Sequence, residues 1–296
     1  MANLKEVRNR ITSVSSTQQI TSAMKMVSAA KLRRAQDAIV QMRPYADKLR
    51  EILENLSSSL GSSDSSFSKK RDVKKVLLIV VTSNRGLCGA FNTNVNKRAQ
   101  RLANNEYKNQ KVSVLCVGKK ANDFFKKTDI PIFDGGLAKE IAAIFDHVSF
   151  DHIAPIAESV MNAFLSSEFD KVEVIYNQFK NAAVQQTVTE QFLPVIPTVA
   201  HTSGGKKGHT IDYIFEPDKE FIVKDLIPRS LKTQFYKAIL DSHASEHGAR
   251  MTAMHKATDN AKDILRNLKL SYNKARQAAI TNEILEIVGG AEALKG

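Results

Sequence analysis

Hydrophobic positions in the first sixty residues recur alternately every three and every four residues, from Leu4 to Leu56. Twelve of the sixteen positions in this series are apolar, which is typical of a long helix with a coiled-coil seam. Pro44 interrupts the pattern and predicts a local kink. We therefore expect an N-terminal coiled-coil helix over residues 1–57.

The four polar positions of this series are consecutive, running from Gln18 to Ser28. Over the same stretch the apolar residues fall on a different stripe of the helix, made of Ile20, Ala23, Met24, Val27 and Ala30. A seam that changes face suggests that the packing partner changes as well. We expect these turns to face another chain.

The hydrophobic period changes behind a serine-rich, charged stretch over residues 58–74, which we expect to be a linker. Runs typical of buried strands lie at 75–82, 111–117 and 171–179, with a further strand at 184–195. They alternate with helical stretches near 92–104, 119–127, 137–146 and 151–167. This order predicts a Rossmann-like α/β domain with a largely parallel sheet over residues 75–200, followed by a basic, flexible loop over residues 201–217.

The helical spacing returns over residues 218–296, with an alanine-rich seam that runs from Leu240 to Ala279. A sixty-residue helix is roughly 90 Å long, whereas a domain of ~130 residues is only about 30–40 Å across. We therefore expect the two terminal helices to pair as a long antiparallel coiled coil and to project from the domain as a shaft. The fold class is α/β with this coiled coil attached.

Lysine and arginine exceed aspartate and glutamate by 43 to 31, which gives a net charge of +12. Such an excess favours an anionic partner: nucleic acid, an anionic membrane surface or an acidic protein face. The longest strongly apolar run, Val76–Val81, is far shorter than the ~20 residues of a membrane-spanning helix. Cys88 and Cys116 lack metal or disulfide spacing and have no suitably placed histidine for catalysis.

Two motifs suggest chemistry, and each has a structural alternative. The segment Asn84–Ala90 follows the first strand, where α/β proteins often bind phosphates, but it matches neither GxGxxG nor a P-loop. A tight turn explains its glycines as well. His243, Glu246 and His247 match the HxxEH zinc pattern, yet catalytic zinc needs a third protein ligand and a pocket. The residues alone indicate neither an active site nor a bound cofactor or metal.

The basic residues of the terminal helices and the apolar C-terminus are more informative. Lys25, Lys31, Arg33 and Arg34 gather near Met24, where they form either a solvated face or a contact with an acidic protein. The segment 280–291 is apolar around most of its circumference, so we expect other chains to enclose it.

Four stretches now carry a resemblance to a known family: Arg10–Gln36, Asn84–Asn92, Ser245–Asn260 and Tyr272–Leu294. The sequence resembles the gamma subunits of bacterial-type F-type ATP synthases over essentially its whole length. One departure is Asn84, which stands where many members have an aspartate. This puts in doubt any role assigned to that acid.

The resemblance implies a central rotor without catalytic residues of its own. In this family the paired helices turn inside a ring of three alpha and three beta subunits, and proton flow drives ATP synthesis at the beta subunits. The implied partners also include epsilon, delta and the ring of c subunits, but no nucleic acid. Nucleotide and magnesium are bound by the partners, so no cofactor is expected here. The implied location is the cytoplasmic face of the bacterial plasma membrane, as a peripheral subunit.

The resemblance also implies two contact sites. Arg276 and Gln277, with Thr281 and Glu283 beside them, correspond to the family's "catch" for a beta-subunit loop. Met24, Lys25, Lys31, Arg33 and Arg34 correspond to the region that meets the acidic lever loop of beta. The alternative from another class is a basic coiled-coil protein that binds nucleic acid or an anionic membrane surface.

Overall fold

The computed structural model describes residues 4–59, 67–68, 71–137, 141, 143–145, 148–195 and 219–293. The chain divides into two compact units. The helix-pair unit comprises Met1–Ala29 and Arg250–Gly296, and the α/β unit comprises Ala30–Ala249. Two long helices, α1 (Leu4–Ser59) and α6 (Lys219–Ala293), contribute residues to both units. Helix α1 continues through Pro44 as one helix.

The sheet of the α/β unit has four strands in the order β2-β1-β3-β4. Strand β1 (Lys75–Val81) pairs in parallel with β2 (Lys111–Val117) and with β3 (Lys171–Phe179). Strand β4 (Gln185–Leu193) pairs antiparallel with β3. Every residue of β1 after Lys75 is buried, because layers cover both faces of the sheet. The predicted largely parallel sheet is confirmed.

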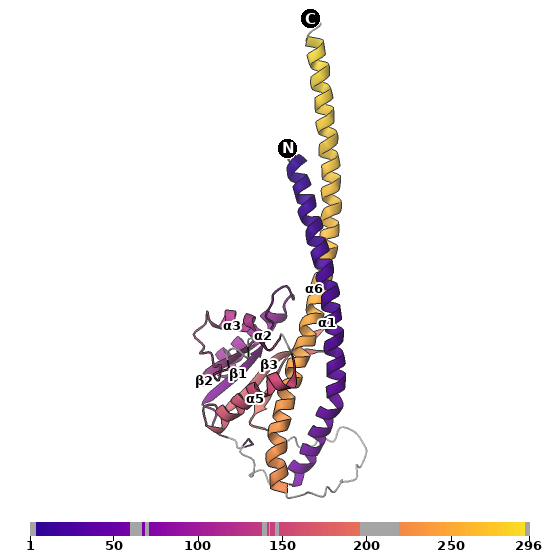
Figure 1. The fold of residues 1–296 in the computed structure, drawn as a ribbon. Coiled ribbons are helices and arrows are strands. Elements are labelled where there is room, and N and C mark those ends of the chain that lie inside the picture. The colour runs from indigo at the N-terminus through magenta and orange to yellow at the C-terminus, as the bar shows by residue number, and fades with distance from the viewer. Residues whose placement is uncertain are drawn as a thin grey trace, which may run out of the picture. The chain divides into compact units, whose positions relative to one another are not determined.

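Each face of the sheet carries its own hydrophobic cluster (Figure 1). On one face lie α2 (Phe91–Arg101), the π-helical turn η1 (Leu102–Glu106) and α3 (Lys119–Phe125). On the other face lies α5 (Phe150–Leu165), packed with the first half of α6. The alternation of buried strands and amphipathic helices thus yields helices on both faces of the sheet.

The first half of α6 corrects one expectation. Leu231, Phe235, Ala238 and Ile239 are buried in the same cluster as the helix α5. The helix is therefore part of the core of the α/β unit over these turns. Helix α6 is 75 residues long and places different segments in different surroundings, so one part packs in the domain although the whole helix is longer than the domain.

In the helix-pair unit, α1 and α6 run antiparallel (Figure 1). An Nη2 group of Arg8 donates a hydrogen bond of 2.9 Å to the Tyr272 hydroxyl, and Thr21 lies 2.9 Å from Thr258. Residue numbers rise along one helix while they fall along the other, which is the predicted direction. The fold class, a long antiparallel helix pair with a Rossmann-like α/β domain, is confirmed.

Several predicted segments lie outside the described residues. These are the loop over 201–217, most of the linker over 58–74 and about half of the helix expected over 137–146. The domain boundaries therefore stay predictions. In the part of the chain that is described, no helix combines the length and the apolar character needed to cross a membrane.

Candidate functional site

The four catch residues lie on α6 beyond Tyr272, which Arg8 near the start of α1 contacts, and α6 extends past the start of α1 (Figure 1). Arg276, Gln277, Thr281 and Glu283 are all exposed. The Thr281 hydroxyl donates a hydrogen bond of 2.9 Å to the Gln277 carbonyl of its own helix. Helical spacing places Gln277 and Thr281 on one face and Arg276 and Glu283 on another. The structure thus presents donors and acceptors on two sides of one helix.

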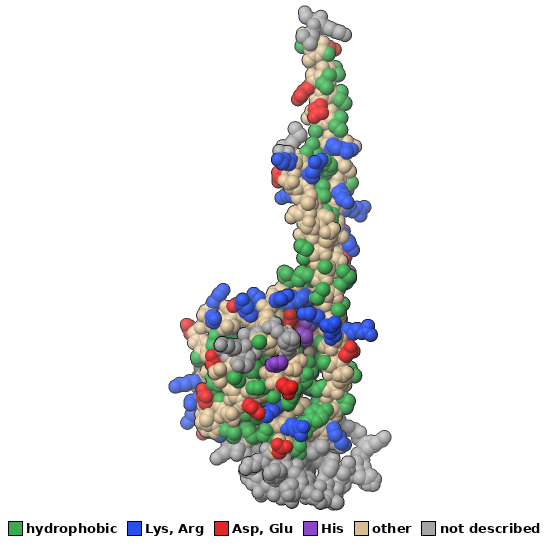
Figure 2. Space-filling view, viewed as in Figure 1, with side chains coloured by type: hydrophobic (Ala, Val, Ile, Leu, Met, Phe, Trp, Pro, Cys, Tyr) green, Lys and Arg blue, Asp and Glu red, His purple; other side chains and the backbone are tan. Residues whose placement is uncertain are grey.

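Large apolar side chains surround these polar residues on the same helix. Figure 2 shows hydrophobic side chains along this end of α6. The exposed members are Ile280, Ile284, Leu285, Ile287 and Val288, of which Ile287 is 72% exposed. Contiguous exposed apolar surface of this kind marks a site that another chain covers. The geometry can therefore support protein–protein contact.

The lever residues divide between the two units along α1. Met24 and Lys25 are half-buried in the helix-pair unit, whereas Lys31, Arg33 and Arg34 are exposed in the α/β unit. One continuous helix carries all five side chains. Their exposure is compatible with contact to an acidic partner, and the assignment stays a prediction.

The predicted change of seam between Gln18 and Ser28 is wrong. Thr21 is 9% exposed and Ser28 is 2% exposed, whereas Ile20 and Val27 are 59% and 58% exposed. The polar positions stay in the seam because their hydroxyls are satisfied: Thr21 donates to the Gln18 carbonyl and Ser28 to the Met24 carbonyl. The apolar stripe is left on the surface of the helix-pair unit instead.

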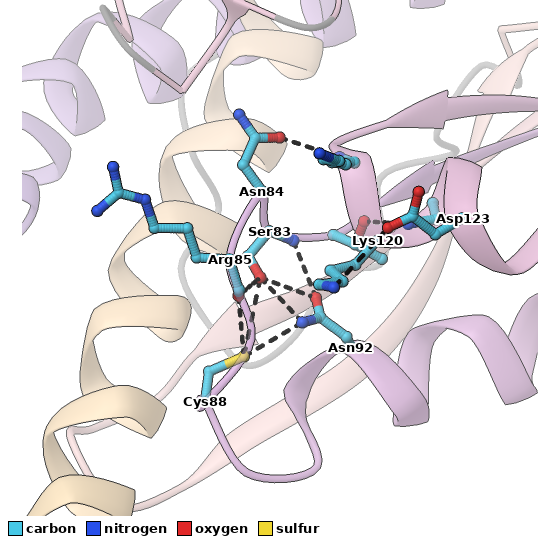
Figure 3. Close-up of polar contacts among 10 residues, drawn as sticks. Ser83, Asn84, Arg85, Cys88, Asn92, Lys120 and Asp123 are labelled. Atoms are coloured by element: carbon cyan, nitrogen blue, oxygen red, sulfur yellow. Dashed lines mark hydrogen bonds and ion pairs between the residues drawn. The ribbon is translucent and has the colours of Figure 1, made fainter.

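The loop after β1 forms a compact turn held by its own side chains and by Asn92 of α2 (Figure 3). The Asn92 side chain accepts a hydrogen bond of 2.9 Å from the Ser83 backbone N–H and donates one of 3.2 Å to Cys88 Sγ. Ser83 Oγ donates to the Arg85 carbonyl at 2.7 Å. Leu87 and Gly89 adopt positive φ angles of 64° and 60°, the left-handed conformation that such a turn requires. The geometry supports the structural interpretation of this motif.

The HxxEH residues lie on α6 inside the α/β unit. The Nε2 atoms of His243 and His247 are 3.1 Å apart, and the Phe145 ring stacks on His243. Burial, with a contribution from Lys31, lowers the pKa of His243 to about 4. Because one ring must accept the hydrogen bond from the other, at least one of these histidines is neutral. Among the described residues, no three His, Cys, Asp or Glu side chains form a group that could hold a metal ion.

The sequence did not predict the contacts that Tyr107 and Lys171 make with Glu173. The Tyr107 hydroxyl donates a hydrogen bond of 2.6 Å to Glu173, and Lys171 Nζ lies 2.7 Å from the same carboxylate oxygen. Burial, followed by the bond to Glu173, raises the pKa of Tyr107 to about 12. No sequence spacing indicates this cluster. The contact between Thr21 and Thr258 did have a signal, because both residues are polar positions of the two counted seams.

Comparisons with known proteins account for nearly the whole chain. A family model described as ATP synthase matches residues 3–294. The ATP synthase gamma chain of Flavobacterium psychrophilum is 61% identical over 297 residues, covering 100% of both chains. That of Cytophaga hutchinsonii is 55% identical over 304 residues, covering 99% of each. The chain belongs to the family of ATP synthase gamma chains.

Solved structures agree with this family in fold. A chain in the mitochondrial ATP synthase of Euglena gracilis matches with a TM-score of 0.66 and 24% identity, over 98% of this chain and 94% of that one. A chain in the central stalk and c-ring structure of Tetrahymena thermophila matches with a TM-score of 0.57 and 25% identity, over 80% and 99%. The resemblance to gamma subunits is confirmed, and nothing in these comparisons supports a nucleic-acid-binding protein.

Proposed function

We propose that this gamma-chain family member is the central rotor of an F-type ATP synthase. The observation that carries the proposal is the match at 61% identity over the full length of a bacterial ATP synthase gamma chain. The titles of the similar structures name a central stalk with a c-ring and a rotor, which supports the same role here.

The proposed partners are three alpha and three beta subunits, the epsilon and delta subunits and the c-ring. The exposed apolar end of α6 supports enclosure by a ring of larger subunits, because it would otherwise remain in water. The chain would then be a peripheral component at the cytoplasmic face of the bacterial plasma membrane.

In this proposal the chain couples ion flow to catalysis without catalysing a reaction itself. Nucleotide and magnesium are bound by the partner subunits, and the gamma chain holds no cofactor. A rotor favours one state of a catalytic site over another only through contacts that differ between those states. Arg276 and Gln277 are suited to this task because their exposed side chains offer a multi-donor fork and an amide that both donates and accepts.

Co-purification tests the proposal. When this chain carries an affinity tag and is expressed in the organism that produces it, purification by the tag should recover alpha and beta subunits together with ATPase activity. Recovery of the chain without these subunits would contradict the rotor function. A DNA titration of the purified chain tests the alternative, which requires tight binding that weakens steeply with salt.

A further inference from the structure

Thr21 of α1 and Thr258 of α6 meet inside the seam of the helix-pair unit. Their Oγ1 atoms are 2.9 Å apart, and the two residues are 9% and 7% exposed. Val7, Ala261 and Leu265 are buried in the same unit. A hydrogen bond between two buried hydroxyls therefore joins the two helices.

Each hydroxyl also has an acceptor on its own helix. Thr21 Oγ1 lies 3.0 Å from the Gln18 carbonyl oxygen, and Thr258 Oγ1 lies 2.8 Å from that of Met254. Each hydroxyl has a single proton: Thr258 donates its proton across the interface to Thr21, and Thr21 donates to the Gln18 carbonyl of its own helix. This arrangement gives one interhelical hydrogen bond and satisfies both donors.

Counting from this pair by alternating steps predicts the neighbouring layers of the seam. Gln18 falls opposite Ala261, and Val14 falls opposite Leu265. Further along the series Val7 falls opposite Tyr272, and the structure places the adjacent Arg8 in a hydrogen bond with that same tyrosine. Two polar contacts, separated by 13 positions on α1 and by about 20 Å of helix, thus specify one register.

We infer that Thr21 and Thr258 are positioning residues that fix the register of the two helices. Leucine, alanine and valine tolerate small displacements because their contacts are non-directional. A buried interhelical hydrogen bond does not, because a shift of one turn leaves it broken. A polar residue in a coiled-coil seam specifies register in this way, at a cost in stability.

Disulfide formation in the full-length chain measures the register directly. One variant carries Val14→Cys with Leu265→Cys, the pair expected in register. A second carries Val14→Cys with Ala261→Cys, which is displaced by one turn and should oxidise slowly because disulfides need Cα atoms within about 7 Å. The readout is the ratio of the two oxidation rates, with and without Thr21→Val and Thr258→Val.

The double valine variant should lower this ratio by about fivefold, the factor that ~1 kcal/mol gives. Its urea midpoint should stay unchanged or rise, because replacing both partners by apolar groups of similar shape is neutral or stabilising. Ser28→Ala is the matched control, since it removes a buried hydroxyl that donates to the Met24 carbonyl of its own helix. That variant should leave the ratio unchanged.

An unchanged ratio in the double valine variant would overturn the inference, and so would an equal loss in Ser28→Ala. The ratio reports helix register in the chain itself. Failure would therefore leave the proposed rotor function standing, and failure of co-purification would leave the register measurement valid.

Discussion

Gly248 of α6 lies directly against the backbone of Ala182, at the tip of the hairpin that joins β3 to β4. A Cβ atom at Gly248 would come within 3.2 Å of the Ala182 carbonyl oxygen and 3.4 Å of its Cα atom. The hairpin tip is held in place by Asn181, whose side chain accepts hydrogen bonds from the backbone N–H groups of Ala183 and Val184. The glycine therefore lets the edge of the sheet approach the helix.

Gly248→Ala should lower the free energy of unfolding by about 1 kcal/mol. Alanine gains up to ~1 kcal/mol of helix propensity, but overpacking against backbone costs about 1–3 kcal/mol. Urea unfolding followed by circular dichroism measures the net change. Hydrogen exchange of the Ala183 and Val184 amides should accelerate, because the tip must move away.

Gly289→Ala is the control for this prediction. Gly289 lies on the same helix, but an added Cβ would have no heavy atom within 4 Å. Only the propensity gain applies there, so helicity should rise. A Gly248→Ala chain as stable as the Gly289→Ala chain would mean that the close approach to Ala182 costs nothing.

The elements that the sequence predicts correctly are those whose signal lies in neighbouring residues. The strands at residues 75, 111 and 171 begin where their β-branched runs begin, since both faces of the sheet are buried and need continuous apolar residues. The helix pair follows from the 3-4 spacing in the same way. These features are encoded in neighbouring residues.

The partners of residues that lie far apart in the sequence are not specified by local spacing. The hydrophobic spacing marks Thr21 as a polar interruption of the seam. In the structure Thr21 belongs to the seam, because it forms a hydrogen bond with Thr258, 237 positions away. The Tyr107–Glu173 bond, across 66 positions, has no local pattern at all. The catch residues came from resemblance, and the structure adds that they are exposed beyond the paired segment.

Two buried titratable groups on α6 should give opposite pH dependences of stability. Burial raises the pKa of Asp241 to about 6; Glu190 on β4 adds to this, while Lys237, Arg43 and Lys180 oppose it. Burial lowers the pKa of His243 to about 4. Between about pH 4 and 6 the folded state holds an extra proton on Asp241 and lacks one on His243, relative to the unfolded chain.

Single substitutions should separate the two effects. Asp241→Asn leaves the histidine, so the free energy of unfolding should rise by about 2–3 kcal/mol between pH 4 and 6.5. His243→Gln leaves the aspartate, so it should fall by a similar amount between pH 4 and 6. Urea midpoints at several pH values provide the measurement. Parallel profiles for the two variants would show that these residues do not control the pH dependence.

Neutralising the lever residues should change coupling more than stability. Replacing Lys25, Lys31, Arg33 and Arg34 with glutamine removes four positive charges; the latter three are exposed, and exposed charges contribute only ~0–1 kcal/mol each to folding. If they meet an acidic loop of beta, the assembled complex should keep its subunits but pump fewer protons per ATP hydrolysed. Proton pumping and ATPase activity in reconstituted vesicles are the measurements.

A control with the same loss of charge distinguishes this contact from a general electrostatic effect. It replaces four exposed cations of the α/β unit with glutamine: Lys97, Arg101, Lys126 and Lys127. Equal changes in coupling for both quadruple variants would count against the lever assignment.

The catch residues should matter for cooperative turnover and not for folding. Arg276 and Gln277 are exposed, so Arg276→Ala with Gln277→Leu should change the free energy of unfolding by no more than about 0.5 kcal/mol. In the assembled complex the same change removes the donors that can hold a loop of one beta subunit at a time. Multisite ATP turnover should fall about tenfold, the effect of ~1.4 kcal/mol lost from one state. Single-site turnover should be unchanged, because it does not require the rotor to pass between sites.

Arg266→Ala with Asn267→Leu provides the matched control for this pair. Arg266 and Asn267 are also adjacent and exposed, and they too are an arginine followed by a residue with a side-chain amide. They differ in lying in the part of α6 that pairs with α1. Equal losses of multisite turnover in both double variants would point to a general defect of the helix. A loss confined to the Arg276 and Gln277 variant, with unchanged helicity, would place the contact with beta at the unpaired end, where a side chain can reach a partner without disturbing the seam.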